Sequence, residues 1–151
     1  MSKLLKKMGA EVNFESDNSI SVDSSKLDNP FAPYDLVKTM RASFYVLGPL
    51  LARFGNAKVS LPGGCAWGPR PVDFHLDGLK ALGVKISIEN GYVIADGSNL
   101  IGSKIHFPKI SVGATGNIVM VAILARGTTT ITNAASEPEI QQLCKMLNSM
   151  G

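Results

Sequence analysis

The sequence predicts a mixed α/β (α+β) fold in which a unit of helices and strands is repeated and incomplete. Three observations support this prediction. Segments with apolar residues at helical spacing alternate with short segments of two-residue alternation. Glycines follow most of the helical segments, as is typical of helix ends. Finally, similar segments recur at a distance of about 74 residues, which indicates a repeat architecture.

The composition is that of an ordinary globular chain. Its 151 residues are 45% hydrophobic and 18% charged, enough for one domain with a sizeable core. The longest apolar run, Ile118–Ala125, is too short to cross a bilayer, and the first residues lack a signal-peptide pattern. We therefore expect a cytoplasmic protein with no membrane partner. The net charge of +3 is mild and no basic block suggests nucleic acid, although the positive bias suits a small anionic substrate.

The N-terminal part predicts a helix followed by a hairpin. Apolar residues at helical spacing run up to Gly9, where we expect the helix to end. Two alternating segments, Glu11–Phe14 and Ser19–Val22, predict the strands of the hairpin. In the second strand the pattern predicts that Ile20 and Val22 face inward.

A loop and a long helix are predicted next. The polar, proline-bearing stretch Ser24–Pro33 favours a loop. A single apolar stripe then predicts one helix, which Gly48-Pro49 would kink and Gly55 would end. The stripe consists of Leu36, Met40, Phe44, Leu47 and Leu51.

The second half of the chain repeats this alternation. The predicted strands are Ala57–Leu61, Lys85–Ile88, Tyr92–Ala95, Ser103–Phe107 and Thr128–Thr132, and the predicted helices are Asp73–Leu82, Val112–Leu124 and one that begins at Ser136–Glu139. In this last helix Cys144 shares a face with Ile140, Leu143 and Leu147, so we interpret it as a small core residue.

Two halves of the chain match each other. The helix-ending glycines Gly9 and Gly83 are about 74 residues apart, and Arg53 and Arg126 occupy matching places before Gly55 and Gly127. The repeat predicts the end of one unit at 1–29, a full unit at 30–103 and the start of the next at 104–151. We expect the chain to be part of a longer protein, because each end of the chain falls in the middle of a repeat unit.

The stretch between the strand at 57–61 and the helix at 73–82 holds the first candidate site. It contains three Gly, three Pro and Cys65, so a mobile glycine bend would present a thiol. Arg70 and the N-terminus of the following helix would favour its thiolate form. A loop cysteine without a chemical role is the alternative, and we leave both open.

Two neighbours of the cysteine also carry candidate chemistry. Arg70, beside Pro71 and just before a helix, could hold a phosphate in two places, or be an ordinary surface charge. Asp73 could be the N-cap or a first-turn acid of the helix, or accept hydrogen bonds from a base or sugar. His75 is predicted to lie on the helix surface. The two His and two Cys residues have no zinc-binding spacing, so no metal is expected.

A second candidate site follows the strand at 103–107. Ser111–Gly116 opens a helix and could cradle a phosphate, with Lys109 adding charge, although a capping serine with small residues explains the same pattern. Lys38 and Arg41 are three residues apart, so they could converge on one anion.

These motifs resemble the UDP-N-acetylglucosamine 1-carboxyvinyltransferase (UDP-N-acetylglucosamine enolpyruvyl transferase) family. Leu61–Ala66 together with Gly68–Asp73 looks like the family's catalytic loop, and Ala32–Ser43 is similar to the segment before it. Ser111–Thr115 and Asn133–Glu139 match later segments. The resemblance covers essentially the whole chain. It implies βαβαββ units arranged as an inside-out α/β barrel, of which this chain would hold an incomplete domain.

The resemblance also implies a reaction and its residues. The family transfers the enolpyruvyl group of phosphoenolpyruvate to the 3′-hydroxyl of UDP-N-acetylglucosamine and releases phosphate, without a cofactor, in the first committed step of peptidoglycan synthesis. Cys65 would be the catalytic proton donor and the residue alkylated by fosfomycin. The residues implied to bind substrate are Arg41, Arg70, Pro71, Val72, Asp73, Phe74, Lys109, Ile110, Ser111 and Val112.

The chain also departs from the family pattern. The resemblance implies that the chain starts after the family's lysine-asparagine pair and does not include the second domain with its aspartate base. Trp67 stands where the family more often has an aliphatic residue. We therefore expect this chain alone to be inactive, as part of the first domain. A nucleotide-sugar binding module without catalysis is the alternative, and the transferase acting on shikimate 3-phosphate or a thiol hydrolase fits the motifs less well. Bare repeat faces would allow a homo-oligomer.

Overall fold

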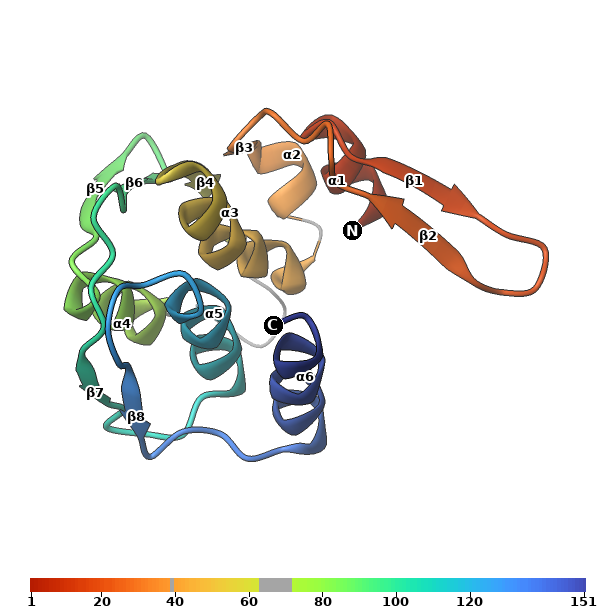
Figure 1. Cartoon of the computed structure of the whole chain (residues 1–151). Coiled ribbons are helices and arrows are strands. Elements are labelled where there is room, and N and C mark those ends of the chain that lie inside the picture. Colours follow the sequence, from red (N-terminus) through yellow and green to blue (C-terminus); the bar gives the residue numbers. More distant parts are fainter. Residues whose placement is uncertain (39, 63–71) are drawn as a thin grey trace.

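The computed structural model describes residues 1–38, 40–62 and 72–151, which form helices around three small sheets (Figure 1). No helix among these residues is long and apolar enough to cross a membrane. In chain order the elements are α1 (Ser2–Lys7), β1 (Glu11–Phe14), β2 (Ile20–Asp23), β3 (Phe31–Ala32), α2 (Tyr34–Val37), the 3₁₀ helix η1 (Arg41–Val46), α3 (Leu47–Phe54), β4 (Asn56–Ser60), α4 (Asp73–Ala81), β5 (Lys85–Glu89), β6 (Tyr92–Asp96), β7 (Lys104–His106), α5 (Val112–Ala122), β8 (Thr130–Thr132) and α6 (Pro138–Ser149).

The largest sheet has four strands in the order β3-β4-β6-β5. β3 runs parallel to β4, whereas β6 pairs antiparallel with β4 on one edge and with β5 on the other. The register places Ile94 of β6 opposite Lys58 of β4 and Ser87 of β5. The other two sheets are pairs, β1 with β2 and β7 with β8. The mixed α/β fold class predicted from the alternating patterns is therefore confirmed.

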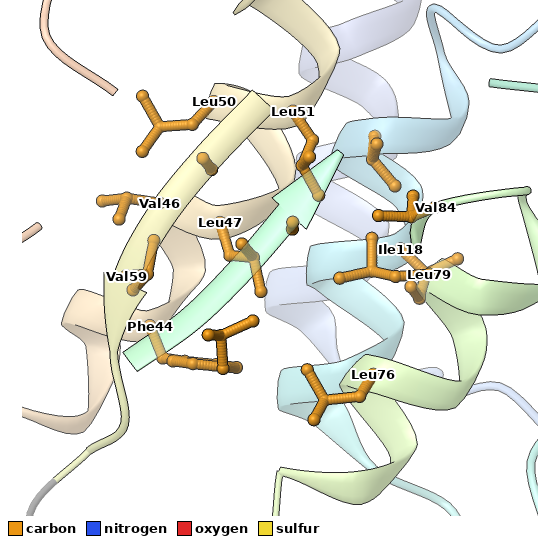
Figure 2. Packing of buried hydrophobic residues seen from close by; sticks show 14 of the residues in the cluster. Phe44, Val46, Leu47, Leu50, Leu51, Val59, Leu76, Leu79, Val84 and Ile118 are labelled. Atoms are coloured by element: carbon orange, nitrogen blue, oxygen red, sulfur yellow. The ribbon is translucent and has the colours of Figure 1, made fainter. Parts of the chain in front are cut away.

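The core lies where the sheet meets the helices. Figure 2 shows side chains of η1, α3, β4, α4 and α5 that point toward one another. Leu47 and Leu51 of α3, Leu79 of α4 and Ile118 of α5 have essentially no exposed surface. The apolar stripes of α3 and α4 both meet α5, so these three helices share one apolar core.

Three glycines follow helices where the sequence predicted helix ends. Gly9, Gly55 and Gly83 have φ of 102°, 69° and 90°, the left-handed region that favours glycine. Gly127 also has a positive φ of 86°, but α5 already ends at Ala122, so Gly127 does not end that helix. Gly9 and Gly83 occupy corresponding places in the repeat. The residue before each glycine accepts a backbone hydrogen bond from the segment that follows the hairpin: the Asp28 N–H donates to the Met8 carbonyl, and the Ile101 N–H donates to the Leu82 carbonyl.

The single helix predicted from Leu36 to Leu51 is wrong. The structure divides it into α2, η1 and α3, with Met40 in extended backbone between the first two. Pro49, where a kink was predicted, lies in the first turn of α3, where its missing N–H has no intrahelical partner to lose. In addition, the predicted loop Ser24–Pro33 contains the whole of the two-residue strand β3.

Two burial predictions are also wrong. Ile20 and Val22 of β2 were predicted to face inward, yet they are 56% and 52% exposed, since in the described part of the chain no helix packs extensively on β2 as α1 packs on β1. Cys144 of α6, predicted to be a core residue, is only half-buried, whereas Ile140 on the same helix is buried. In α6, the buried residue is therefore Ile140, near the start of the helix.

Candidate functional site

The start of α5 and the 3₁₀ helix η1 border a cavity of about 470 Å³. Its lining includes three of the residues predicted to bind substrate, Ile110, Ser111 and Val112, followed by Gly113. The opposite wall consists of Ala42 and Tyr45 of η1. Tertiary structure thus brings the predicted phosphate cradle next to the helix that begins with Arg41.

Ser111 caps α5. Its extended backbone precedes the helix, and its Oγ accepts a hydrogen bond from the Ala114 N–H at 3.3 Å. The N–H groups of the first turn of a helix have no intrahelical partners and carry partial positive charge. The capping role predicted for Ser111 is confirmed, and the same geometry makes this end of α5 compatible with an anion.

Lys109 adds charge just before this turn. Its side chain is exposed, as is Ile110 at 62%. Lys38 does not join them, because its Nζ lies 2.9 Å from the Asp35 carboxylate. That hydrogen bond and the attraction between the charges raise the pKa of Lys38. The Asp35 carboxylate of α2 therefore competes with any anion that Lys38 was predicted to bind together with Arg41.

His75 is buried on α4, so the prediction of a surface histidine is wrong. Only 6% of its surface is exposed, and its ring packs edge-on against Phe44 with centroids 5.2 Å apart. Its Nε2 lies at the first turn of α5, since a Cβ added to Gly113 would be 3.2 Å from that atom. Glycine at this position lets the imidazole approach the α5 backbone closely.

Asn117 of α5 is a polar residue of this region that sequence reasoning missed. It is fully buried, and its side chain contacts Gly48, Phe44 and His75. The signal that could have revealed it is the presence of an amide at the beginning of the apolar run in α5. Buried polar groups are expensive unless they are hydrogen-bonded, so such a residue indicates a specific network.

The residues predicted at the start of α4 have different surroundings. Val72 is the N-cap and is half-buried, whereas Asp73 is exposed in the first turn and the helix has no side-chain cap bond. The ring of Phe74 lies 6.4 Å from that of the buried Phe107. Asp73 is therefore a first-turn acid of α4, one of the two structural roles considered for it, and it is not the N-cap. Phe74 packs toward the core.

Several predicted residues fall outside what the structure describes. Cys65, Arg70 and Pro71 lie between the described residues 62 and 72. The backbone of Arg41 begins η1, but its side chain is not among those described. Within the described ranges no cluster of three His, Cys, Asp or Glu side chains could hold a metal ion. The site is thus defined by η1, α4 and α5.

A larger cavity of about 540 Å³ lies on another side of α3 and is mainly apolar. Its lining includes Leu5 of α1, Leu50 of α3 and Ile140 of α6. Arg53 and Glu139 also line it, but most of its surface is apolar, so few of its groups could orient a charged ligand. The smaller cavity at the start of α5 is therefore the better candidate for polar chemistry.

The comparisons with known proteins agree with one another. The family model "EPSP synthase (3-phosphoshikimate 1-carboxyvinyltransferase)" matches residues 1–151. A protein of Vesicomyosocius okutanii is 60% identical over 99% of this chain, and one of Chlorobium limicola is 57% identical over the same share. Both are named UDP-N-acetylglucosamine 1-carboxyvinyltransferase, and this chain spans 36% of the length of each.

Solved structures show the same fold. The enolpyruvyl transferase NikO of Streptomyces tendae superposes with a TM-score of 0.78 at 21% identity, and covers 99% of this chain. An EPSP synthase of Acinetobacter baumannii gives a TM-score of 0.74 at 18% identity. In each case the match takes up 35% of the solved chain.

Proposed function

The chain belongs to the EPSP synthase family, and we propose that the protein containing it transfers the enolpyruvyl group of phosphoenolpyruvate to the 3′-hydroxyl of UDP-N-acetylglucosamine. The observation that supports this proposal is the shared name of relatives that are 56–60% identical over nearly all of this chain. Because the chain spans about a third of their length, the activity is proposed for the whole protein.

The reaction proceeds by addition and elimination. The sugar 3′-hydroxyl loses its proton as its oxygen bonds to C2 of phosphoenolpyruvate, the carbon that carries the phosphate, while a proton adds to the methylene carbon C3. The bond from C2 to the phosphate oxygen then breaks and a proton leaves the C3 methyl group, so that the enol ether and inorganic phosphate remain. Such a sequence needs a proton donor to carbon and a positive environment for phosphate.

The residues proposed for these tasks are those indicated by the motifs. Cys65 donates the proton to the methylene carbon. Arg41, the run from Arg70 to Phe74, and the run from Lys109 to Val112 hold the nucleotide sugar. The α5 N-terminus capped by Ser111, the exposed Lys109 and the adjoining cavity support the last of these assignments.

A phosphate-release assay on the whole protein tests the reaction. We expect release from phosphoenolpyruvate to require UDP-N-acetylglucosamine, and shikimate 3-phosphate to give none. Release with shikimate 3-phosphate alone would contradict the proposal. Calorimetric binding of UDP-N-acetylglucosamine without turnover in the whole protein would instead favour the binding module. For this chain by itself we expect no turnover.

The role of Cys65 is tested by mass spectrometry after exposure to fosfomycin. We expect an adduct at Cys65 in the whole protein and slow or no labelling in this chain by itself. Cys65→Ser serves as the matched control and should remain unlabelled, while Cys144 stays intact in both. Labelling of Cys144 in place of Cys65 would overturn the assignment.

Further proposals follow from the same family membership. We propose a cytoplasmic enzyme of peptidoglycan synthesis, needed for cell shape and division. The unit boundaries are proposed at 29/30 and 103/104, which leaves the four-stranded sheet within one unit. Exposed repeat faces, such as that of β1–β2, are the proposed contact surface of any homo-oligomer.

A further inference from the structure

The side-chain amide of Asn117 connects three elements. Its Oδ1 accepts a hydrogen bond from the Gly48 N–H of α3 at 2.7 Å. Its Nδ2 lies 3.3 Å from the Phe44 carbonyl oxygen of η1 and 3.1 Å from Nδ1 of His75 on α4. Asn117 itself has no exposed surface, so every one of these contacts is shielded from water.

The orientation of this amide follows from its partners. A backbone N–H only donates, so the Asn117 atom facing Gly48 must be the oxygen. The nitrogen then faces two acceptors, one of which is the carbonyl oxygen of Phe44. A flipped amide would place two donors together at Gly48 and two acceptors together at Phe44, at a cost of several buried hydrogen bonds.

This orientation fixes the proton of His75. Because Asn117 Nδ2 donates, Nδ1 of His75 must accept and therefore carries no proton. In a neutral imidazole the proton then resides on Nε2. That nitrogen is the one next to Gly113, in the first turn of α5 that borders the cavity.

The contact with Gly48 also sets how closely two helices approach. A side chain at Gly48 would overlap with the amide and the carbonyl oxygen of Asn117. α3 therefore lies against α5 at a distance that only glycine allows. Since η1 leads directly into α3, this contact also fixes Tyr45, which forms the wall of the cavity opposite Gly113.

We propose that Asn117 is a positioning residue, which holds His75 as the Nε2-protonated tautomer and fixes η1 against the start of α5. It does not touch the proposed substrate. Its effect on binding rests on the proposed function, whereas its effect on the tautomer does not.

The tautomer is measured by long-range ¹H–¹⁵N correlation of the imidazole rings in the ¹⁵N-labelled chain. Only His75 and His106 contribute signals, and His106→Gln assigns them. We expect His75 to show the pattern of the Nε2-protonated tautomer, with the other form at least about tenfold rarer. A wild-type ring protonated at Nδ1 would overturn the proposal without any variant.

Asn117→Asp tests the cause. The aspartate keeps an acceptor for the Gly48 N–H but presents an oxygen to Nδ1 of His75, so a proton should move onto Nδ1. An unchanged His75 spectrum in the folded variant would overturn the role of Asn117. Thr115→Val is the matched control, since Thr115 is also buried on α5 and binds the Ala135 N–H at 3.0 Å, away from His75. Its His75 spectrum should match that of wild type.

Kinetics of the whole protein separate this proposal from the proposed function. In Asn117→Asp we expect the KM for UDP-N-acetylglucosamine to rise about tenfold, with a smaller change in kcat. An inactive wild-type protein that keeps the expected tautomer would contradict the transferase and leave the role of Asn117 intact. An active enzyme with His75 protonated at Nδ1 would contradict the role of Asn117 alone.

Discussion

The two hairpins of the chain, β1–β2 and β5–β6, have corresponding pairings but different surroundings. Glu11 pairs with Asp23 in the first as Lys85 pairs with Asp96 in the second. By this register Ile20 corresponds to Val93, and Val22 to Ala95. Val93 and Ala95 are 0% and 2% exposed, whereas their counterparts are 56% and 52% exposed.

The difference arises from the second edge of each hairpin. β6 pairs with β4 as well as with β5, and α3 packs against β4 from below. In the described ranges β2 pairs with β1 alone, and the hairpin extends away from the helices in Figure 1. α1 covers β1 in the way that α4 covers β5, which leaves Val12 buried at 3%.

Strand pairing and burial of the apolar face therefore have different origins. Both hairpins form from local alternation around a turn, and in both an asparagine occupies the left-handed region, Asn18 with φ 63° and Asn90 with φ 51°. Burial of the apolar face needs a third strand and its helix. A two-stranded hairpin alone is only marginally stable.

The largest expected effect comes from placing a charge at the corresponding positions Val93 and Ile20. Val93→Asp buries an unpaired carboxylate and should cost more than about 4 kcal/mol, a large part of a typical stability. Ile20→Asp should change the free energy of unfolding by less than about 1 kcal/mol, because that side chain is already exposed. Urea denaturation followed by circular dichroism measures both.

A milder pair of substitutions keeps the difference measurable if Val93→Asp unfolds the protein completely. Val93→Ala should cost about 2 kcal/mol through lost burial and a cavity, and Val22→Ala less than about 0.5 kcal/mol. Equal losses of stability from Ile20→Asp and Val93→Asp would show that the face of β2 is covered in solution. Light scattering would then reveal whether a second copy of the chain covers it.

Hydrogen exchange should reveal a difference in opening free energy between the same strands without any substitution. Amides of β6 are held by pairing on both edges, whereas β2 can open with the hairpin alone. We expect opening of β2 to require about 3 kcal/mol less, which makes its paired amides exchange about a hundredfold faster. Equal protection of the two strands would mean that the hairpin unfolds only with the core.

The smallest effect concerns the aspartates that end the hairpins, where the two regions should behave alike. Asp23 accepts a hydrogen bond from the Ser25 N–H at 2.8 Å, and Asp96 from the Ser98 N–H at 3.0 Å. These backbone bonds, followed by side-chain bonds from the same serines, lower the pKa of both carboxyls below the ordinary 3.8.

A lowered pKa gives these aspartates a stabilising effect that is present above pH 3.8 and lost as pH falls through the folded pKa. Asp23→Asn and Asp96→Asn should therefore be slightly less stable than wild type near neutral pH, by similar amounts. The difference should vanish in acid. Thermal unfolding from pH 2 to pH 7 measures it, and a gap that widens in acid would contradict this assignment.

Part of the site could be predicted from the sequence, but the buried polar residues that join its helices could not. The capping serine of α5 was predicted because Ser111 directly precedes an apolar helical segment. His75 was misplaced because helical periodicity does not reveal that a partner amide on another helix satisfies a buried imidazole. Asn117 escaped notice for the same reason, since its partners lie on η1, α3 and α4.

The amino-acid sequence specified the local structure of this chain: the strands, most helices and the glycines that follow several of those helices, because these depend on neighbours within a few residues. It also determined the repeat and the family. Only tertiary structure decided which apolar faces are buried, where the helix after Leu36 is interrupted, and how Asn117 joins three elements. Those outcomes depend on contacts between residues far apart in the chain, and local patterns do not encode which partner is present.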